Sequence, residues 1–453
     1  MSHLLSAKFN QHLHSLLASL VNKQSAQPRL IVALSGGVDS VVLLHLLKDF
    51  QGQYGQYQVI AHNVNHGLSE NAQQWGSFCK DLCHQLAIPF ISSHVVIQKK
   101  SRTSLEALAR DARYQCFQEK MQDNDIILTG HHEDDQLETL LLALKRGSGS
   151  TGLQGIRTQQ DFFTGSLLRP LLIFSRVQLV NYANEHGLQW IEDESNQNTD
   201  FDRNFIRHNV SPLLNKRWPA IAKSASRTAQ LCQEQQSLLD EIAIEDLNAC
   251  LVESFAQKTL LVSAAARFSD ARRNNLIRHW LKSNGLQYPS HKQLKILWQE
   301  VALAAADKQP QLRLGTYLIR RYQGRLYIVS EQPLALPEKP LNWSGEDILW
   351  IDKNRLGVDF SAVSKELAKQ YNVSCYLRKH LDASLTCLPE GRDKPRTIKK
   401  LLHEYQVPPW LRDHVVFVFV DGQLIEALDV WKCEDNKSKL LADAISPSLY
   451  SDD

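Results

Sequence analysis

The residues best suited to binding phosphate stand near the start of the chain, where an apolar run at 30–34 meets a turn rich in glycine and serine. The turn consists of Ser35, Gly36, Gly37, Val38, Asp39 and Ser40. An amphipathic run at 41–47 follows it, so we predict strand, turn and helix. This unit directs backbone amides and a positive helix end at an anion, which glycine lets approach closely. The serine hydroxyls can donate to phosphate, and the Asp39 carboxylate can hold magnesium.

The turn differs from the two most familiar nucleotide-binding loops. It has neither the Gly-x4-Gly-Lys-Ser/Thr pattern of the Walker A loop nor the Gly-x-Gly-x-x-Gly pattern of dinucleotide-binding folds. It resembles instead the pyrophosphatase loop, or PP-loop, of adenylating enzymes that convert ATP to AMP and pyrophosphate. The alternative is an ordinary turn between a strand and a helix that binds nothing.

A second candidate site is the segment 129–139, which contains four carboxylates within six residues: Glu133, Asp134, Asp135 and Glu138. Asp135 and Glu138 are three residues apart, so a helix places both on one face. Such a cluster repels itself unless Mg²⁺ or the ammonium of an amine substrate compensates for the charge. One alternative is a solvated helix N-terminus, where acidic residues are favoured anyway. Another is a zinc site made of His131, His132 and Asp135.

Basic residues elsewhere in the first half of the chain could also contact phosphate. His66 lies in the segment 62–68, which ends a predicted strand, and it could bind phosphate or act as an acid. Arg110 and Arg113 share a helix face and could clamp a phosphate between two guanidinium groups. The alternative for Arg110 is a simple ion pair with Glu106, four residues earlier.

Two further groups of residues are candidates for contact with nucleic acid. Arg203 and Arg207 are helical neighbours that could grip a nucleic-acid backbone or close over bound ATP. The segment 376–412 has eight Lys or Arg and four acidic residues. It supplies Arg392, Lys399, Lys400, Trp410 and Arg412. Basic side chains beside an exposed tryptophan suit phosphate contact and base stacking, whereas the alternative is a solvated charged face.

The alternation of strand-like and helix-like runs predicts how these motifs are positioned. Strands are expected at 30–34, 58–63, 90–95 and 125–129, and helices at 41–50, 71–86, 105–121 and 134–145. Such alternation is typical of a Rossmann-like α/β fold with a parallel sheet and helices on both faces. Ligands in such folds bind at the carboxyl ends of the strands, where the motifs at 35–40, 62–68 and 129–138 all lie.

The remainder of the chain indicates two further domains, since 453 residues are too many for one core. We predict an adenylation domain at 1–216, a mainly helical substrate-positioning domain at 217–332 and a small mixed α+β domain at 333–453 that binds nucleic acid. The stretch 218–306 has an almost wholly helical pattern, and 316–330 is typical of a hairpin. A second hairpin turns at Asp421 and Gly422, and a helix is expected at 398–405.

Composition excludes several classes of protein. The chain is 43% hydrophobic and 22% charged with a net charge of +2, which is typical of a globular protein. No apolar stretch reaches the 18 residues of a membrane span, and the N-terminal apolar spacing indicates an amphipathic helix rather than a signal peptide. The eight cysteines include no Cys-x-x-Cys pair. We therefore expect neither a zinc ribbon nor a disulfide framework, and a cytoplasmic protein.

Taken together, these segments resemble the bacterial tRNA(Ile)-lysidine synthetase family of the PP-loop ATP pyrophosphatase superfamily. The resemblance is carried by 35–40, by Val-Asn-His-Gly-Leu at 64–68, by Glu-Ala-x-Ala-Arg-x-x-Arg-Tyr at 106–114, and by 129–139. It continues through 146–156, Arg-Pro-Leu at 169–171, 192–207, and the C-terminal segments 391–401 and 408–412. Two positions depart from the family pattern: Ser69 stands where arginine is usual, and Asp393 adds an acid to a basic segment.

The resemblance implies a reaction in two steps. ATP adenylates the C2 oxygen of the wobble cytidine in an isoleucine tRNA with a CAU anticodon, and free lysine then displaces AMP to form lysidine. Carried over by motif, residues 35–40 and His66 would contact ATP, and Asp39 and Asp135 would hold magnesium or lysine. Glu138 would bind the lysine ammonium, and Arg113 or Arg110 the activated intermediate. Lysine must lose a proton before it attacks, so a proton acceptor is expected at the site.

Three other functions remain as alternatives at this point. A tRNA thiolase could share the loop but would need catalytic cysteines or an iron–sulfur site, and the absence of Cys-x-x-Cys disfavours it. An amidotransferase-type synthetase for a small metabolite would not need the basic C-terminal segment. A non-catalytic nucleotide- or RNA-binding scaffold would not need the acidic cluster. The sequence leaves the oligomeric state open, with a homodimer as one option.

Overall fold

The computed structural model describes residues 2–20, 28–65, 67, 71–95, 105–255, 257–305, 308–352, 355–434 and 447–450. Two sequence positions discussed above, His66 and Ser69, lie outside these ranges. The chain divides into two compact units, Met1–Ser237 and Leu238–Asp453. The three-domain boundaries expected from the sequence therefore stay a prediction. Among the described helices, none has both the length and the apolar character needed to cross a membrane.

The first unit is built on a six-stranded, mostly parallel sheet. In order across the sheet, the strands are β3 (Phe90–His94), β2 (Gln58–Asn65), β1 (Arg29–Ala33), β4 (Ile126–Leu128), β6 (Gly165–Leu168) and β5 (Gln159–Phe162). Neighbours from β3 to β6 run parallel, whereas β5 is antiparallel to β6. The four strands predicted from the sequence and their Rossmann-like arrangement are confirmed. The edge hairpin β5–β6 was not predicted.

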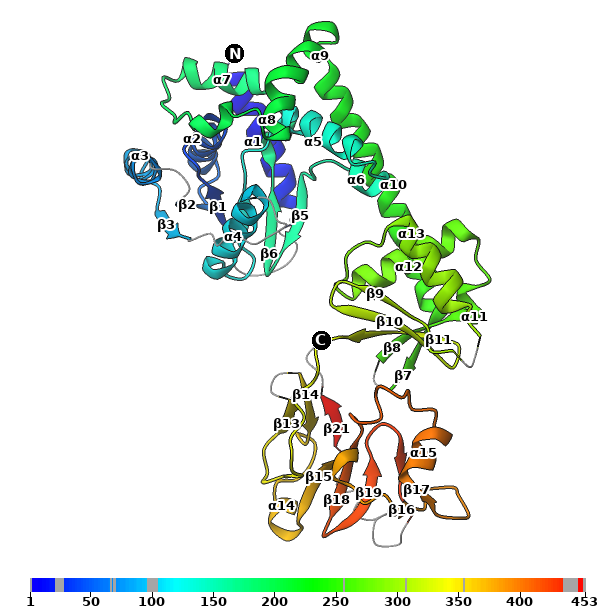
Figure 1. Ribbon diagram of the computed structural model, residues 1–453. Helices are drawn as coiled ribbons and strands as arrows, with labels where there is room; N and C mark the ends of the chain where they lie inside the picture. Colours follow the sequence, from blue (N-terminus) through cyan, green and yellow to red (C-terminus); the bar gives the residue numbers. More distant parts are fainter. Residues whose placement is uncertain are drawn as a thin grey trace. The chain divides into compact units, whose positions relative to one another are not determined.

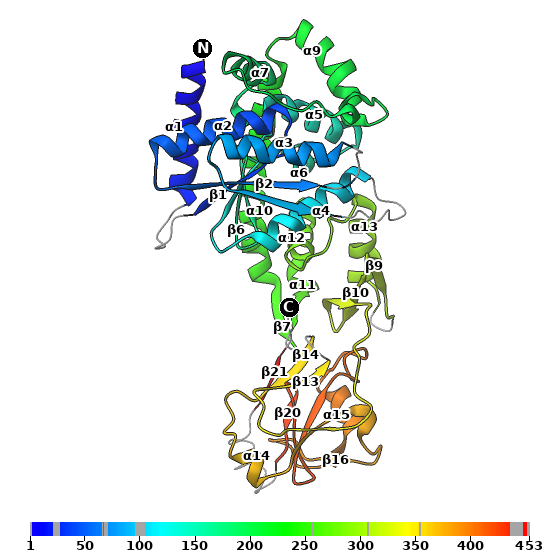
Figure 2. The same ribbon diagram turned by 90° about the vertical axis from the view of Figure 1, so that its left-hand side faces the viewer.

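Helices cover both faces of this sheet, which explains its continuous apolar strands (Figure 2). One face carries α1 (Ser2–Leu20), α2 (Val38–Gln53), α3 (Ala72–Gln85) and α7 (Arg176–Glu185). The other carries α4 (Leu105–Lys120). Along β1, Leu30 and Val32 pack in the core under α1, α2, α3 and α7, whereas Ile31 packs in the core under α4. This alternation follows from the two-residue period of a strand.

Short helical elements extend from the carboxyl edge of the sheet to the end of the first unit. They are α5 (Glu133–Lys145), α6 (Ser150–Leu153), the 3₁₀ turns Pro170–Ile173 and Glu194–Gln197, α8 (Asp202–Phe205), the π-helical turn η3 (Ile206–Val210) and α9 (Ser211–Arg217). Helix α10 (Ile221–Cys250) starts in the first unit, where Ala222 and Ala225 pack on Leu137 of α5. Apolar packing thus fixes the outer face of α5 and leaves its other face for polar side chains.

The first part of the second unit combines helices with an antiparallel sheet (Figure 1). In order, its strands are β7 (Leu251–Ser254), β8 (Gln257–Leu261), β11 (Arg325–Ser330), β10 (Tyr317–Tyr322) and β9 (Gln311–Leu314). Its helical elements are α11 (Val262–Ala265), α12 (Asp270–Ser283), α13 (His291–Ile296) and the π-helical turn Leu297–Ala302. The predicted hairpin β10–β11 is confirmed. The expectation of an almost wholly helical 218–306 is wrong at β7 and β8, because periodicity cannot assign such short apolar runs.

The last part of the second unit contains three small sheets. The largest joins β12 (Leu341–Asn342), β15 (Val373–Leu377), β18 (Val416–Val420), β19 (Gln423–Ala427) and β20 (Trp431–Lys432). The others are β13 (Ile348–Asp352), β14 (Leu356–Asp359) and β21 (Ser448–Tyr450), and the pair β16 (Thr386–Cys387) and β17 (Arg396–Thr397). Helical elements are α14 (Leu367–Gln370), Arg378–His380 and α15 (Ile398–Glu404). The predicted helix and the β18–β19 hairpin are confirmed, and both turn residues of that hairpin have positive φ.

The cysteines differ in part from the sequence-based expectation. Cys387 and Cys433 form a disulfide with a Cα–Cα distance of 6.3 Å, although no disulfide was expected. The two residues are 46 positions apart and meet only because β16 and the end of β20 come together, which spacing alone does not reveal. Cys79 and Cys83 share the buried face of α3 as expected, and burial raises the pKa of each thiol to about 12.

Gly130, just after β4, is required by the close approach of two elements. A Cβ at this position would lie 3.0 Å from the Asp39 carbonyl carbon and 3.2 Å from the Ser40 amide nitrogen. Both atoms belong to the rigid first turn of α2, so they cannot move aside as a flexible side chain would. Gly130 therefore lets the segment after β4 lie directly against the start of α2.

We expect Gly130→Ala to destabilise the first unit by about 1–3 kcal/mol, because the added methyl group overpacks the α2 N-terminus. Urea unfolding followed by circular dichroism measures the change. Gly55→Ala is the matched control, since a Cβ there would meet nothing within 4 Å. Equal stability of the two variants would contradict this account of Gly130.

Candidate functional site

The glycine–serine turn after β1 has the open geometry that an anion site needs. Gly36 has a φ of +89°, and its Cβ would lie only 2.8 Å from Cδ1 of Ile191, so no other residue fits there without strain. The Ile191 amide donates to the Gly36 carbonyl at 2.9 Å and fastens the turn to the segment after α7. Helix α2 then starts with Gly37 as its N-cap and no side-chain capping bond. Its N-terminal amides are thus available to a ligand.

The two serines of the turn have different environments. Ser40 is buried, and its hydroxyl lies 3.3 Å from the Ser35 amide and 3.2 Å from the Gly36 amide, which both donate to it. The same hydroxyl donates to the Gly37 carbonyl at 2.9 Å. Ser40 therefore fixes the backbone conformation of the turn from inside, whereas the Ser35 side chain is exposed. Phosphate contact by Ser40 stays a prediction, and its internal role was not foreseen.

Helix α5 carries the acidic pair into the protein rather than into solvent. Asp135 is 7% exposed and Glu138 is 2% exposed, and both lie on the same face as their spacing predicts. A solvated helix N-terminus is therefore the wrong interpretation for these two residues. Asp135 also accepts a 2.9 Å hydrogen bond from the His132 amide, which caps the start of the helix. The cap fixes this carboxylate relative to the strand end.

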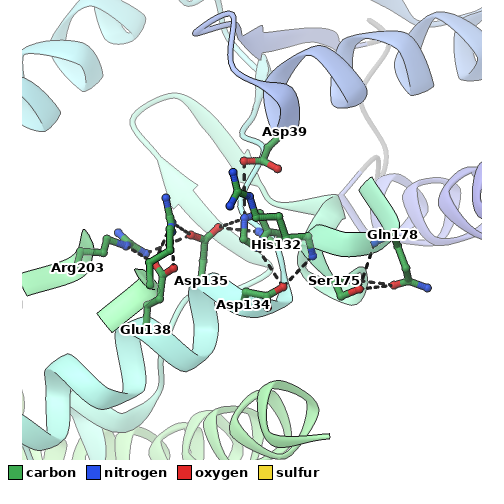
Figure 3. A network of polar contacts seen from close by, with 10 residues as sticks. Asp39, His132, Asp134, Asp135, Glu138, Ser175, Gln178 and Arg203 are labelled. Carbon is green, nitrogen blue, oxygen red and sulfur yellow. Dashed lines mark hydrogen bonds and ion pairs between the residues drawn. The ribbon is translucent and has the colours of Figure 1, made fainter. Parts of the chain in front are cut away.

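Arg203 and Arg207 neutralise the acidic pair. Figure 3 shows Arg203 beside Glu138. Nε of Arg203 donates to Oε2 of Glu138 at 2.9 Å, and Nε of Arg207 donates to Oε1 at 2.6 Å. Nη2 of Arg207 reaches Oε2 of Glu138 at 3.0 Å and Oδ1 of Asp135 at 3.2 Å. The two arginines were expected to face a nucleic-acid backbone or ATP. In the structure their guanidinium groups instead lie on the buried carboxylates.

His132 joins the two sequence motifs into one site (Figure 3). Its Nε2 lies 3.7 Å from Oδ2 of Asp39 and 3.6 Å from Oδ2 of Asp135, and the side chain is almost fully buried. Asp39 comes from α2 and Asp135 from α5, so carboxylates from both motifs approach a single nitrogen. The contact brings together the two elements that the sequence placed at one sheet edge.

The electrostatics of the two carboxylates differ. Burial raises the pKa of Asp39 above its ordinary value, and Asp135 adds to this effect while His132 opposes it. Burial also acts to raise the pKa of Asp135, but His132, His131 and Arg203 together with the backbone amide lower it to about 2. Asp135 is therefore held as an anion. Oδ1 of Asp39 is buried without a hydrogen-bond partner among the described residues, and Nδ1 of His132, which also makes no hydrogen bond there, lies 3.7 Å from Oδ2 of Asp134. A carboxylate oxygen buried in this way indicates an incomplete site.

Two other residues of the acidic segment, Asp134 and Gln136, tie neighbouring segments to α5. Asp134 accepts a 2.8 Å hydrogen bond from the Arg176 amide at the start of α7. The Gln136 side chain accepts from the Ile156 amide at 2.7 Å and so ties a loop to α5. These partners lie far away in the sequence, so the motif by itself does not distinguish structural residues from ligand-binding ones.

The arginines of α4 belong to a separate cationic group. Arg110 and Arg113 are exposed, and Nη2 of Arg110 lies 3.4 Å from the Tyr114 hydroxyl. Arg169, just after β6, is 2% exposed, and its Nη1 donates to the Arg157 carbonyl at 2.6 Å. The sequence did not single out Arg169 as a site residue, although its Arg-Pro-Leu segment carried part of the resemblance. The alternative pairing of Arg110 with Glu106 falls on a side chain outside the description.

The basic segment of the second unit presents a pair of adjacent exposed lysines. Lys399 and Lys400 lie on the solvent side of α15, with Ile398, Leu401 and Leu402 buried beneath. We find no ion pair of either lysine with another described residue. Arg392 and Arg396 are also exposed, but both approach Glu404, at 3.8 and 3.7 Å. Arg412 donates to the Val407 carbonyl at 3.0 Å. Lys399 and Lys400, like Lys394, thus carry exposed charge that no ion pair with a described residue neutralises.

Trp410 differs from the expectation of an exposed stacking platform. Its ring is half-buried and makes edge contacts with Tyr327 and Tyr322, with ring centroids 5.6 and 6.0 Å apart. The guanidinium of Arg320 lies 5.2 Å from its centroid. The expectation of exposure was wrong because tertiary contacts to β10 and β11, some 80 or 90 residues away in sequence, cover the ring.

The structure lends no support to a zinc site. In the parts of the chain that the structure describes, no group of three or more His, Cys, Asp or Glu side chains is arranged to hold a metal ion by protein ligands alone. Asp39 and Asp135 would instead provide two carboxylates, which suits a cation that shares its ligands with a bound phosphate.

Three family models match the chain in succession. A PP-loop domain matches residues 5–214, a TilS substrate binding domain matches 260–327, and a TilS substrate C-terminal domain matches 376–444. The first covers the sheet, the loop and the acidic helix. The third covers the basic segment with Lys399 and Lys400.

Full-length relatives show the same similarity. The chain is 42% identical over 428 residues to a tRNA(Ile)-lysidine synthase of Serratia proteamaculans, covering 93% of this chain and 95% of the relative. It is 39% identical to the protein of the same name from Photorhabdus laumondii, with the same coverage of both chains. Among solved structures it is similar to the U34-tRNA thiolase NcsA of Methanococcus maripaludis, with a TM-score of 0.42 and 15% identity over 51% of this chain and 80% of the other. A likeness this low adds nothing to the family evidence.

We expect Trp410→Ala to lower the stability of the second unit by about 1–3 kcal/mol, because a half-buried aromatic cluster loses its central ring. Urea unfolding of the full chain measures the loss, and Trp410→Phe should recover much of it. Trp218→Ala is the control, since Trp218 is 53% exposed. A stability unchanged by Trp410→Ala would restore the interpretation of a free stacking surface.

Proposed function

The chain belongs to the tRNA(Ile)-lysidine synthase family. We propose that the turn at 35–40 binds ATP for the first step of lysidine formation, and that the acidic pair binds lysine for the second. The chain is an ATP-dependent ligase that forms lysidine on tRNA(Ile). In the first step, the C2 carbonyl oxygen of the wobble cytidine, in a CAU anticodon, attacks the α-phosphorus of ATP and pyrophosphate leaves. In the second, the side-chain amine of lysine attacks C2 and AMP leaves with the oxygen.

The turn at 35–40 would bind the phosphates of ATP. The uncapped N-terminus of α2 supplies amides and a positive dipole end, and Ser35 is exposed for a further hydrogen bond. Ser40 holds the turn in shape from inside. These donors also suit the negative charge that builds on the phosphates while pyrophosphate leaves. A contribution of His66 to ATP binding is part of the proposal.

Magnesium would be held by Asp39 together with the phosphates, with Asp135 as a second candidate ligand. The fit rests on Oδ1 of Asp39, which is buried without a hydrogen-bond partner among the described residues. When bound, the ion would neutralise phosphate charge during attack at the α-phosphorus. The residues of this chain would position it, because His132 draws Asp39 and Asp135 toward a common point.

Lysine would bind through an ammonium group at the acidic pair. Glu138 and Asp135 form a buried pair of carboxylates, the partners that an ammonium prefers, and Arg203 and Arg207 contact the pair in the structure. We assign Arg113 to contact the adenylated intermediate, as an exposed cation on α4. The carboxylates would orient lysine so that its amine meets the activated carbon in a productive geometry.

The C-terminal segment would grip the tRNA. Lys399 and Lys400 provide exposed positive charge for phosphate contact, with Arg392 and Arg412 beside them as weaker candidates. Trp410 would support this surface from behind rather than stack on a base. We place the reaction in the cytoplasm, together with tRNA and ATP, and a homodimer is compatible with this scheme.

One observation carries the proposal: the loop aspartate and the acidic helix meet at His132, within 3.7 Å on each side. A single ligand can therefore touch both motifs. The test mixes the purified protein with ATP, magnesium, labelled lysine and tRNA(Ile). Label in the wobble base, with one AMP and one pyrophosphate per lysidine, is the expected result. Absence of label in the base, with folded protein and all substrates present, would refute the proposal.

We expect Asp39→Asn to reduce pyrophosphate release at least about 100-fold, because the charge that would hold the cation beside the phosphates is lost. Release is measured under saturating tRNA and lysine. Asp49→Asn is the matched control, as the same substitution at an exposed position farther along α2. Near-normal release by Asp39→Asn would remove Asp39 from the site.

We expect the double variant Lys399→Gln/Lys400→Gln to weaken tRNA binding and to lower the slope of log affinity against log salt by about 2, one for each lost phosphate contact. Filter binding across a salt series measures both. The charge-matched control is Lys365→Gln/Lys369→Gln, two exposed lysines elsewhere in the second unit. An unchanged slope would assign Lys399 and Lys400 to a merely solvated face.

A further inference from the structure

Arg207 occupies the place that the proposed function gives to lysine. It donates to both members of the acidic pair, with Nε 2.6 Å from Oε1 of Glu138 and Nη2 3.2 Å from Oδ1 of Asp135. Arg203 donates to the other oxygen of Glu138 at 2.9 Å. Both oxygens of Glu138 thus already accept guanidinium hydrogen bonds. An ammonium that approaches this carboxylate must compete with them.

The arginines and the lysine ammonium compete for the same carboxylates because a buried charge is costly without a partner. Two carboxylates this close cannot both stay ionised in a protein interior without cations beside them. Without lysine, the arginines supply that charge. When a ligand ammonium arrives, the pair has more positive charge than it needs, and one guanidinium becomes available to another anion.

Arg207 is the better candidate for release. Arg203 has a second anchor, since its Nη2 lies 3.4 Å from Oγ1 of Thr139. Arg207 lies in the π-helical turn Ile206–Val210, and such turns interrupt the regular hydrogen bonding of a helix. The two arginine side chains are equally exposed, at 23%, so the second anchor and the π-helical turn are what distinguish them. Arg207 also lies close enough to Asp39 of the phosphate loop for the two charges to influence each other.

We propose that Arg207 is an exchangeable counter-ion: lysine displaces it from Glu138 and Asp135, and it then binds a phosphate group of ATP at the neighbouring loop. The inference rests on the proposed function, because it takes the acidic pair as the lysine site. Oδ1 of Asp39, whose charge interacts with Arg207, is buried without a hydrogen-bond partner among the described residues. Arg207 would thus be a positioning residue that reports lysine occupancy to the phosphate site.

This exchange makes the two ligands mutually dependent. Lysine frees a cation for ATP, and ATP draws away the cation that competes with lysine. By linkage, each ligand must raise the affinity for the other by the same factor. Couplings of this kind typically amount to roughly 5–150-fold, so we expect about tenfold. A static arginine would leave the two affinities independent.

The test is calorimetric titration of lysine into the full-length protein, with and without magnesium and a non-hydrolysable ATP analogue. In the wild type, the analogue should tighten lysine binding about tenfold. In Arg207→Gln, lysine should bind more tightly than to the wild type when the nucleotide is absent, and the analogue should no longer matter. In Glu138→Gln, lysine binding should be lost. Tighter lysine binding in Arg207→Gln would show that Arg207 competes with lysine. Weaker binding would show that it only supports the site.

Controls keep the outcome interpretable. Lys145→Gln removes an exposed ion pair of α5 with Asp202 of α8, the helix next to the turn that carries Arg207, and should behave as the wild type. Arg207→Lys keeps the charge but not the two-pronged contact, and should show reduced coupling if Arg207→Gln fails to fold. Thermal melting verifies the fold of each variant.

Two results would overturn the inference. One is a wild-type lysine affinity that is the same with and without the analogue. The other is weaker lysine binding to folded Arg207→Gln in the absence of nucleotide. Coupling that appears with tRNA but not with the ATP analogue would reject ATP as the phosphate partner and assign the arginine to the tRNA backbone. If the wild type forms lysidine but shows no coupling, the inference fails while the proposed function stands.

Discussion

The structure of the first unit depends on keeping two neighbouring carboxylates ionised inside the protein. Asp135 and Glu138 are both nearly inaccessible to solvent, and removing the partners of such a buried charge costs about 3–5 kcal/mol. The segment 202–210 must therefore return to α5 to bring Arg203 and Arg207 to them. The helix cap from the His132 amide and the packing of α10 on the opposite face hold α5 in the matching orientation.

The same requirement connects the acidic helix to the phosphate loop. His132 stands between Asp39 and Asp135, and Gly130 allows the segment that carries it to lie against the first turn of α2. A parallel sheet brings such segments to one edge, but the close approach depends on a residue without a side chain. In the proposed function, adenylation and amine transfer would share this one compact site, so the activated carbonyl would not need to travel between them.

Much of the fold was predictable from local pattern. The four parallel strands, the helices between them and two hairpins follow from apolar periodicity and from turn residues that tolerate positive φ, such as Asp421 and Gly422. The misses are short elements. Strands β7 and β8 interrupt a helical pattern because four or five apolar residues fit either structure until the β11 neighbour is known. The Cys387–Cys433 bond likewise required sheet pairing.

For the site, the sequence by itself determined which chemical groups are present and that they gather at one sheet edge, because loop, helix start and strand order are local properties of the backbone. Only the tertiary structure decided the partners: Arg207 lies 69 residues from Glu138, and Trp410 packs on Tyr327 rather than facing solvent. The physical reason is that charge compensation and aromatic packing act through space. A residue type states what a side chain can bind, whereas burial and neighbours decide which of its partners it meets.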